Sequence, residues 1–158
     1  MIDAVVFDVG ETLVDETRQH GQWADWLGIP RHTFSAVFGG MVATGREFRD
    51  ALRYFRPDFD LATERRRRAE AGLVDEFTEA DLYPDTRASL AALSDQGLGD
   101  RVDNDVKPAK AAGLHPIYLR RGPWGFISAE HPDLAGHADR QVGSLAEIPP
   151  LLAAVNQG

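Results

Sequence analysis

The feature that most restricts the fold is a short apolar run at residues 4–7, which ends at Asp8 and is followed by Gly10. The run shows no alternation of polar and apolar side chains, and valines occupy its centre. Such a run is typical of a strand that is buried on both faces, as strands are in a parallel sheet. Because parallel neighbours must be joined by crossover connections, the run predicts an α/β fold.

Residues 15–81 show helical periodicity. Three apolar stripes begin at Trp23, Phe34 and Phe48, and residues 61–71 predict a fourth helix. Side chains in these stripes recur three or four positions apart, as in an amphipathic helix. We interpret residues 15–81 as an all-helical subdomain inserted after the first strand. Trp23 and Trp26 are expected to pack within it, and the arginines at positions 65–68 are expected to be solvated.

The chain after residue 81 alternates between helical and strand signals. Pro84 suits the first turn of a helix, for which Leu90 and Leu93 would supply the apolar face. Residues 116–119 predict a strand, and residues 121–125 predict a loop. A last helix is expected over residues 145–155, with Ser144 as its N-cap and Glu147 as the capping-box partner.

Composition excludes several classes of function. The net charge is −8, which argues against a broad nucleic-acid or anionic-membrane surface. The absence of cysteine excludes disulfides and thiolate chemistry. No apolar stretch approaches the ~18 residues of a membrane-spanning helix, and the N-terminus lacks the pattern of a signal peptide, so we expect a cytoplasmic protein without membrane association.

Two places in the chain offer aspartates as candidate site residues. Asp8 lies at the carboxyl end of the first predicted strand, where ligands bind in open α/β sheets. Asp100, Asp103 and Asp105 lie in a single predicted turn. Clustered carboxylates repel each other unless a cation is present, and hard oxygen ligands favour Mg²⁺. The residues alone therefore indicate a carboxylate–Mg²⁺ site for a small anionic substrate.

Two segments carry a resemblance to a known family. Residues 5–13 resemble the first motif of the haloacid-dehalogenase-type (HAD) hydrolases, and residues 99–105 resemble their fourth motif, of the Gly-Asp-x-x-x-Asn-Asp type. The helices in between resemble the family's helical cap. The resemblance implies a HAD-like, Rossmann-type parallel-sheet core over residues 1–14 and 82–158, with the cap over residues 15–81.

The resemblance also implies roles for individual residues. Asp8 would be the nucleophile, forming a covalent aspartyl intermediate. The carboxylate of Asp8 and the carbonyl of Gly10 would bind Mg²⁺ together with Asp100, and Asp105 would support the metal. Thr12 would shape the catalytic turn.

Two further residues are candidates for contact with the substrate. Arg101 and Trp124 are the candidate substrate-binding residues, and a structural loop is the alternative interpretation for the segment of Trp124.

The sequence departs from the family pattern at Gly10. A second aspartate normally stands at this position and protonates the leaving group, a contribution typically worth ~10²–10⁴-fold. The glycine favours chemistry that needs no proton donor, such as halide displacement.

A larger departure lies before Asp100. The family's Ser/Thr strand and its lysine are missing, because both lysines, Lys107 and Lys110, follow Asp105. We therefore expect a core without its central strands. Loss of these strands would leave the backbone of a neighbouring strand unpaired at an exposed sheet edge. Such an edge favours pairing with a second chain, so a homodimer is expected.

Three functional hypotheses follow. The first is a Mg²⁺-dependent hydrolase acting on a small phosphorylated metabolite, with activity impaired by the missing motifs. A 2-haloacid dehalogenase is the alternative among enzymes. The third is a catalytically inactive, HAD-derived protein that binds metal or dimerises. A receiver-like phosphoacceptor role for Asp8 is weaker, because receivers place further acidic residues before the acceptor strand.

Overall fold

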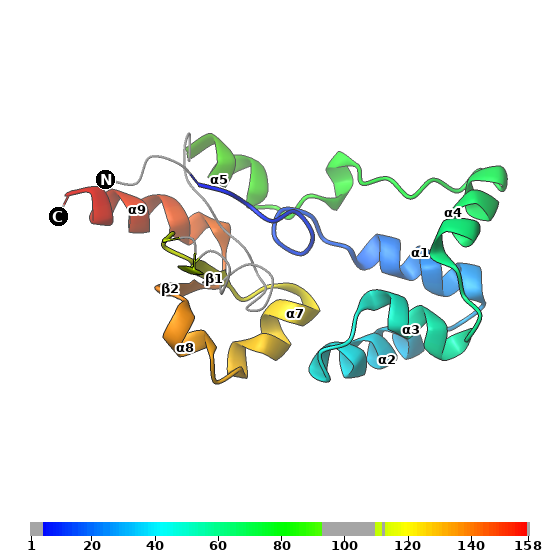
Figure 1. Ribbon diagram of the computed structural model, residues 1–158. Helices are drawn as coiled ribbons and strands as arrows, with labels where there is room; N and C mark the ends of the chain where they lie inside the picture. The colour runs from blue at the N-terminus through cyan, green and yellow to red at the C-terminus, as the bar shows by residue number, and fades with distance from the viewer. Residues whose placement is uncertain (1–4, 93–109, 112, 158) are drawn as a thin grey trace. The chain divides into compact units, whose positions relative to one another are not determined.

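The computed structural model describes residues 5–92, 110–111 and 113–157 (Figure 1). The chain divides into two compact units. Unit 1 comprises Met1–Asp15 and Leu82–Gly158, and unit 2 comprises Glu16–Asp81. Among the described residues, no helix is long and apolar enough to cross a membrane.

Unit 2 is helical throughout its regular structure, in agreement with the periodicity of residues 15–81. Its helices are α1 (Thr17–Leu27), α2 (Arg31–Ala43), α3 (Phe48–Phe55) and α4 (Leu61–Glu70), followed by a 3₁₀ turn, η1 (Glu79–Asp81). Gly28 ends α1 at a φ of 71°, a left-handed conformation that glycine adopts at little cost. Asp60 begins α4 by accepting a hydrogen bond from the Thr63 amide at 2.8 Å.

Aromatic and aliphatic side chains fill the core of unit 2. Trp23, Phe34 and Leu52 are each at most 1% exposed. The Phe34 ring lies 5.8 Å from the ring of Phe48 and 5.9 Å from that of Phe55, centroid to centroid. Removing such surfaces from water stabilises a fold by roughly 25 cal/mol per Å². The expectation that Trp23 packs inside the helical subdomain is therefore confirmed.

The expectation that the arginines at 65–68 are all solvated is wrong for Arg68. Its side chain is 1% exposed, and its guanidinium lies over the Trp23 ring, 4.1 Å from the ring centroid. Burial lowers the pKa of Arg68, and a carboxylate oxygen of Asp75 lies 3.4 Å from its Nη2. A flat guanidinium can stack on an indole face, which is why this arginine is accommodated inside.

An ion pair joins the two ends of unit 2. Arg18 donates from Nε and Nη2 to the two carboxylate oxygens of Asp81, both at 2.6 Å. The Thr78 amide donates to the same carboxylate at 2.7 Å. The hydrogen bond from Arg18 and then the one from Thr78 hold the pKa of Asp81 well below its usual range. The carboxylate therefore stays ionised while it is buried.

Unit 1 contains short helices and a small parallel sheet. Its elements are α5 (Thr86–Ala92), β1 (Ile117–Leu119), α7 (Gly122–Ile127), η3 (Ser128–Glu130), α8 (Leu134–His137), β2 (Arg140–Val142), η4 (Leu145–Glu147) and α9 (Ile148–Gln157). β1 and β2 pair in parallel, with Tyr118 opposite Gln141. The strand expected at residues 116–119 is thus confirmed.

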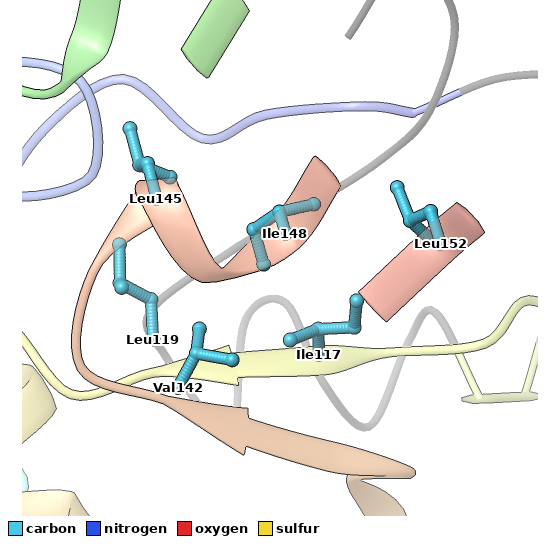
Figure 2. Packing of buried hydrophobic residues seen from close by; sticks show 6 residues of the cluster. All are labelled: Ile117, Leu119, Val142, Leu145, Ile148 and Leu152. Atoms are coloured by element: carbon cyan, nitrogen blue, oxygen red, sulfur yellow. The ribbon is translucent and has the colours of Figure 1, made fainter. Parts of the chain in front are cut away.

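One hydrophobic cluster holds α9 against the sheet. Figure 2 shows the strand side chains of Ile117, Leu119 and Val142 on the same side as Ile148 and the neighbouring leucines. Leu119 and Ile148 are fully buried. Ser144 and Glu147 form the expected capping box at the 3₁₀ turn that precedes α9. Tyr118 and Leu134 form a second buried cluster of unit 1.

Three expectations for unit 1 are corrected by the structure. Val6 is 70% exposed, so the run at residues 4–7 is not buried on both faces, although Val5 and Phe7 pack on the α9 cluster. Residues 121–125 are not a loop, because α7 begins at Gly122 with Pro123 in its first turn. Leu90 is 38% exposed, because α5 buries its small polar residues instead.

Candidate functional site

A tight loop follows Asp8. The carbonyl oxygen of Val9 accepts hydrogen bonds from the amides of Leu13 and Val14, at 2.9 and 3.0 Å. The Thr12 amide approaches the same oxygen at 3.4 Å. Three successive amides thus converge on one carbonyl directly after Asp8, which holds residues 9–14 in a compact turn.

Asp8 itself is half-buried at the entrance to this loop. Within the described part of the chain, its carboxylate takes part in no hydrogen bond or ion pair. A carboxylate without such partners keeps its lone pairs available for a cation or an electrophile. This is the arrangement that a nucleophile or a metal ligand requires.

Glu11 is the residue of the loop with an unusual backbone. Its φ is 53°, in the left-handed region, and its side chain is buried. The Tyr83 hydroxyl donates a hydrogen bond to its Oε2. Burial, and then this hydrogen bond, raise the pKa of Tyr83 well above its usual range, so the phenol remains a donor. The contact ties the loop to the segment that precedes α5.

Close packing against Gly122 supports this position of Glu11. A Cβ at Gly122 would lie 2.4 Å from Oε2 of Glu11 and 2.7 Å from its Cβ. Gly122 also has a φ of 61°, which strains any other residue. The start of α7 therefore needs glycine for two independent reasons.

Arg121 connects three segments of unit 1. Its Nη1 donates to the carbonyl oxygen of Thr12 at 3.0 Å, and its Nη2 donates to the carboxylate of Asp85. The guanidinium also lies over the Tyr83 ring, 4.1 Å from the centroid. The planar fork of arginine allows these three contacts at once.

Asp85 is the common acceptor of this network. Besides Arg121, its Oδ2 accepts from the Ser144 hydroxyl at 2.7 Å and from the Leu145 amide at 3.0 Å. Burial raises the pKa of Asp85, but the hydrogen bonds from Arg121 and Ser144 outweigh it, so that the pKa is lowered overall. The carboxylate is therefore charged at neutral pH and fixes the start of α5 to the turn before α9.

Thr12 is fully buried, and its Oγ1 has no hydrogen-bond partner among the described residues. The neighbouring carbonyl of Leu13 is satisfied by the Tyr83 amide at 3.1 Å and the Thr86 hydroxyl at 2.8 Å. An unpaired buried hydroxyl costs about 1–3 kcal/mol. The loop therefore keeps one buried polar group that none of the described residues satisfies.

The structure brings some of the predicted site residues together. Asp8, Gly10 and Thr12 belong to one loop, and Trp124 lies in α7, in the same unit. Asp100, Arg101 and Asp105 lie outside the described residues. Their predicted roles as metal and substrate ligands stay predictions.

Sequence reasoning missed the residues that hold the loop: Tyr83, Asp85, Arg121 and Gly122. Their signals were present as a Tyr-Pro-Asp segment before a helix and as a pair of arginines after a strand. Neither signal identifies its partner, because the partners lie up to 109 positions away.

Solved structures of other proteins identify the type of fold. No family model and no curated protein matches the chain. The structure is similar to that of a haloacid dehalogenase-like hydrolase from Burkholderia xenovorans LB400, with a TM-score of 0.55, 16% identity and 98% of each chain covered. At this identity the likeness shows the fold alone. The chain therefore has a HAD-like fold, with a small parallel sheet in its α/β part.

Proposed function

We propose that this protein is a Mg²⁺-dependent hydrolase that uses Asp8 as its nucleophile on a small phosphorylated metabolite. The observation that carries the proposal is the half-buried Asp8, without a partner among the described residues, at the entrance to the tight loop of a HAD-like fold. A carboxylate oxygen of Asp8 would attack phosphorus while the bond to the leaving alcohol breaks. Water would then hydrolyse the aspartyl phosphate and restore the carboxylate.

The donors near Asp8 fit Mg²⁺ by their chemistry. The Asp8 carboxylate and the Gly10 carbonyl are hard oxygen donors, and no nitrogen or sulfur ligand is needed. Asp8 and Gly10 would hold the ion, with Asp100 and Asp105 completing the set. When bound, the ion would offset the repulsion between the Asp8 carboxylate and an anionic phosphate.

The leaving group is the point at which Gly10 matters. Glycine has no side chain that could donate a proton to the departing oxygen. Alcohols of low pKa leave without such a proton, so aryl phosphates are expected to react faster than alkyl phosphates. The Glu11 side chain is held by Tyr83 rather than free to take over this role.

The test is hydrolysis of an aryl phosphate with and without Mg²⁺. Asp8→Asn is expected to abolish turnover, because the amide cannot attack phosphorus, and chelation of Mg²⁺ is expected to do the same. Asp58→Asn, at an exposed aspartate of unit 2, is the matched control and should keep the wild-type rate. Turnover that survives Asp8→Asn would refute the proposal.

One observation favours the inactive alternative, a metal-binding or dimerising HAD-derived protein. Lys110 is the only lysine among the described residues, and it donates to Asp139 rather than to Asp8. A folded protein whose thermal midpoint rises with Mg²⁺, but which turns over neither an aryl phosphate nor a 2-haloacid, would support this alternative. Its mass in solution would test the expected homodimer.

A further inference from the structure

We propose that Arg121 is a positioning residue that fixes the loop of residues 9–14 and, through it, the carboxylate of Asp8. The inference rests on the proposed function only for the role of Asp8. The contacts that support it all lie within unit 1 and involve residues that the proposed chemistry does not use.

The guanidinium of Arg121 is itself immobilised. Its side chain is 11% exposed, and it is paired with the carboxylate of Asp85. Asp85 is in turn held by the Ser144 hydroxyl and the Leu145 amide. A half-buried ion pair with further hydrogen bonds on the carboxylate has a defined geometry, because breaking it would leave a partly desolvated charge without its partner.

From this anchored position, Arg121 reaches the loop by two routes. The direct route is the hydrogen bond from Nη1 to the Thr12 carbonyl. The second route runs through Tyr83, whose ring supports the guanidinium and whose hydroxyl binds Glu11. Thr12 is thus bound to Arg121 through its backbone carbonyl. Glu11 is bound through its side chain to Tyr83, on whose ring Arg121 stacks.

The attachment matters for residues 9–12, because the apolar packing of the loop comes from Leu13 and Val14 at its other end, while Val9 is exposed. Thr12 is buried without a partner for its hydroxyl among the described residues, and Glu11 has a strained backbone. Strained backbone persists only where the surroundings hold it in place. Without Arg121, residues 9–14 would relax, and Asp8, one residue before them, would lose its defined direction.

Arg120 provides an internal contrast. It is exposed and stacks on Phe126, with its guanidinium 5.0 Å from the ring centroid, and it donates no hydrogen bond to residues 9–14. Lysine at either position would keep the charge but lose the planar fork. Matched variants at positions 120 and 121 therefore separate the loop contact from a general effect of charge.

The experiment is hydrogen exchange measured by NMR at the amides of Thr12, Leu13 and Val14, which all point to the Val9 carbonyl. Arg121→Lys and Arg121→Met are each expected to speed exchange at these amides roughly tenfold or more. Arg120→Met should leave them unchanged. The Asp139 amide, which donates to the Pro116 carbonyl at 2.8 Å, serves as the reference elsewhere in unit 1.

Unchanged exchange at the three loop amides in both Arg121 variants would overturn the proposal. An equal acceleration at the Asp139 amide would also overturn it, because Arg121 would then stabilise unit 1 as a whole. If Arg121→Met does not fold, Arg121→Lys decides, since it keeps the charge opposite Asp85. Exchange needs neither substrate nor metal, so the result stands even if turnover that depends on Asp8 is not found.

Kinetics distinguish positioning from substrate binding. With turnover on an aryl phosphate, Arg121→Lys is expected to lower kcat roughly tenfold while KM stays unchanged, because misdirection of Asp8 affects the chemical step. A rise in KM at unchanged kcat would overturn the positioning role and place Arg121 at the substrate.

Discussion

Both units have an apolar core, but the contacts that matter most in each lie at different distances along the chain. Unit 2 is one continuous segment, and its core is built from aromatic rings on helices that follow each other in the chain. Unit 1 is discontinuous, and its candidate site depends on the hydrogen bond between Arg121 and Thr12, 109 positions apart. Local apolar packing thus forms one unit, and a few distant polar contacts shape the site in the other.

This difference has a physical consequence. Contacts between neighbours in the sequence cost little loop-closure entropy, whereas a contact over a hundred residues costs more. In unit 1, the hydrophobic cluster of β1, β2 and α9 offsets part of this cost, because Arg121 directly follows β1 and Ser144 directly precedes η4. Three predictions test this comparison.

The largest expected effect comes from truncating one buried side chain in the core of each unit. Phe34→Ala in unit 2 and Leu119→Ala in unit 1 should each cost about 2–5 kcal/mol of unfolding free energy, because both side chains are buried. Urea unfolding followed by tryptophan fluorescence in a Trp124→Phe background reports unit 2 alone, since Trp23 and Trp26 both belong to it.

In that background, Phe34→Ala should lower the midpoint and Leu119→Ala should leave it in place. An equal fall in both variants would show that the two units unfold as one, and the proposed contrast between them would be lost.

A pair of glycine substitutions has a smaller expected effect. Gly122→Ala in unit 1 and Gly28→Ala in unit 2 both force alanine to a positive φ, which costs roughly 1–2 kcal/mol. A Cβ at Gly28 meets nothing within 4 Å, whereas one at Gly122 collides with Glu11. Gly122→Ala should therefore cost about 1–3 kcal/mol more.

Chemical denaturation of both glycine variants measures this difference. Equal losses would mean that Glu11 moves away at no cost, which would weaken the case for a rigid loop after Asp8.

The smallest effect concerns pH and the ion pair of unit 2. The pKa of Asp81 is lowered in the folded state, so its contribution to stability is present above the ordinary aspartate pKa of about 3.9 and is lost as the pH falls through the lowered value. Asp81→Asn should reduce the thermal midpoint by a few degrees at neutral pH, and the difference from wild type should shrink below about pH 4.

Circular dichroism melts across this pH range provide the measurement, with the exposed Asp58→Asn as the control. A difference that persists unchanged into strong acid would indicate that the effect does not come from the charge of Asp81.

The sequence predicted the features of each unit that depend on neighbouring residues and missed those that depend on distant ones. The helices of unit 2 were accessible because their apolar stripes and their end signals, such as Gly28 and Asp60, are local. Arg68 was missed because its burial depends on the Trp23 ring, 45 positions earlier in the chain, which periodicity does not place. In unit 1, the same local reasoning found β1 and the Ser144 capping box but not α7.

The candidate site divides in the same way. Residues 5–13, taken together with residues 99–105, pointed to the HAD-like fold and to a turn after Asp8, because each signal lies within at most nine consecutive residues. Only the tertiary structure decided that Arg121, anchored on Asp85, holds that turn. Buried charges take the partner that the packed core brings within hydrogen-bonding distance, and that choice depends on the assembled fold rather than on neighbours in the chain.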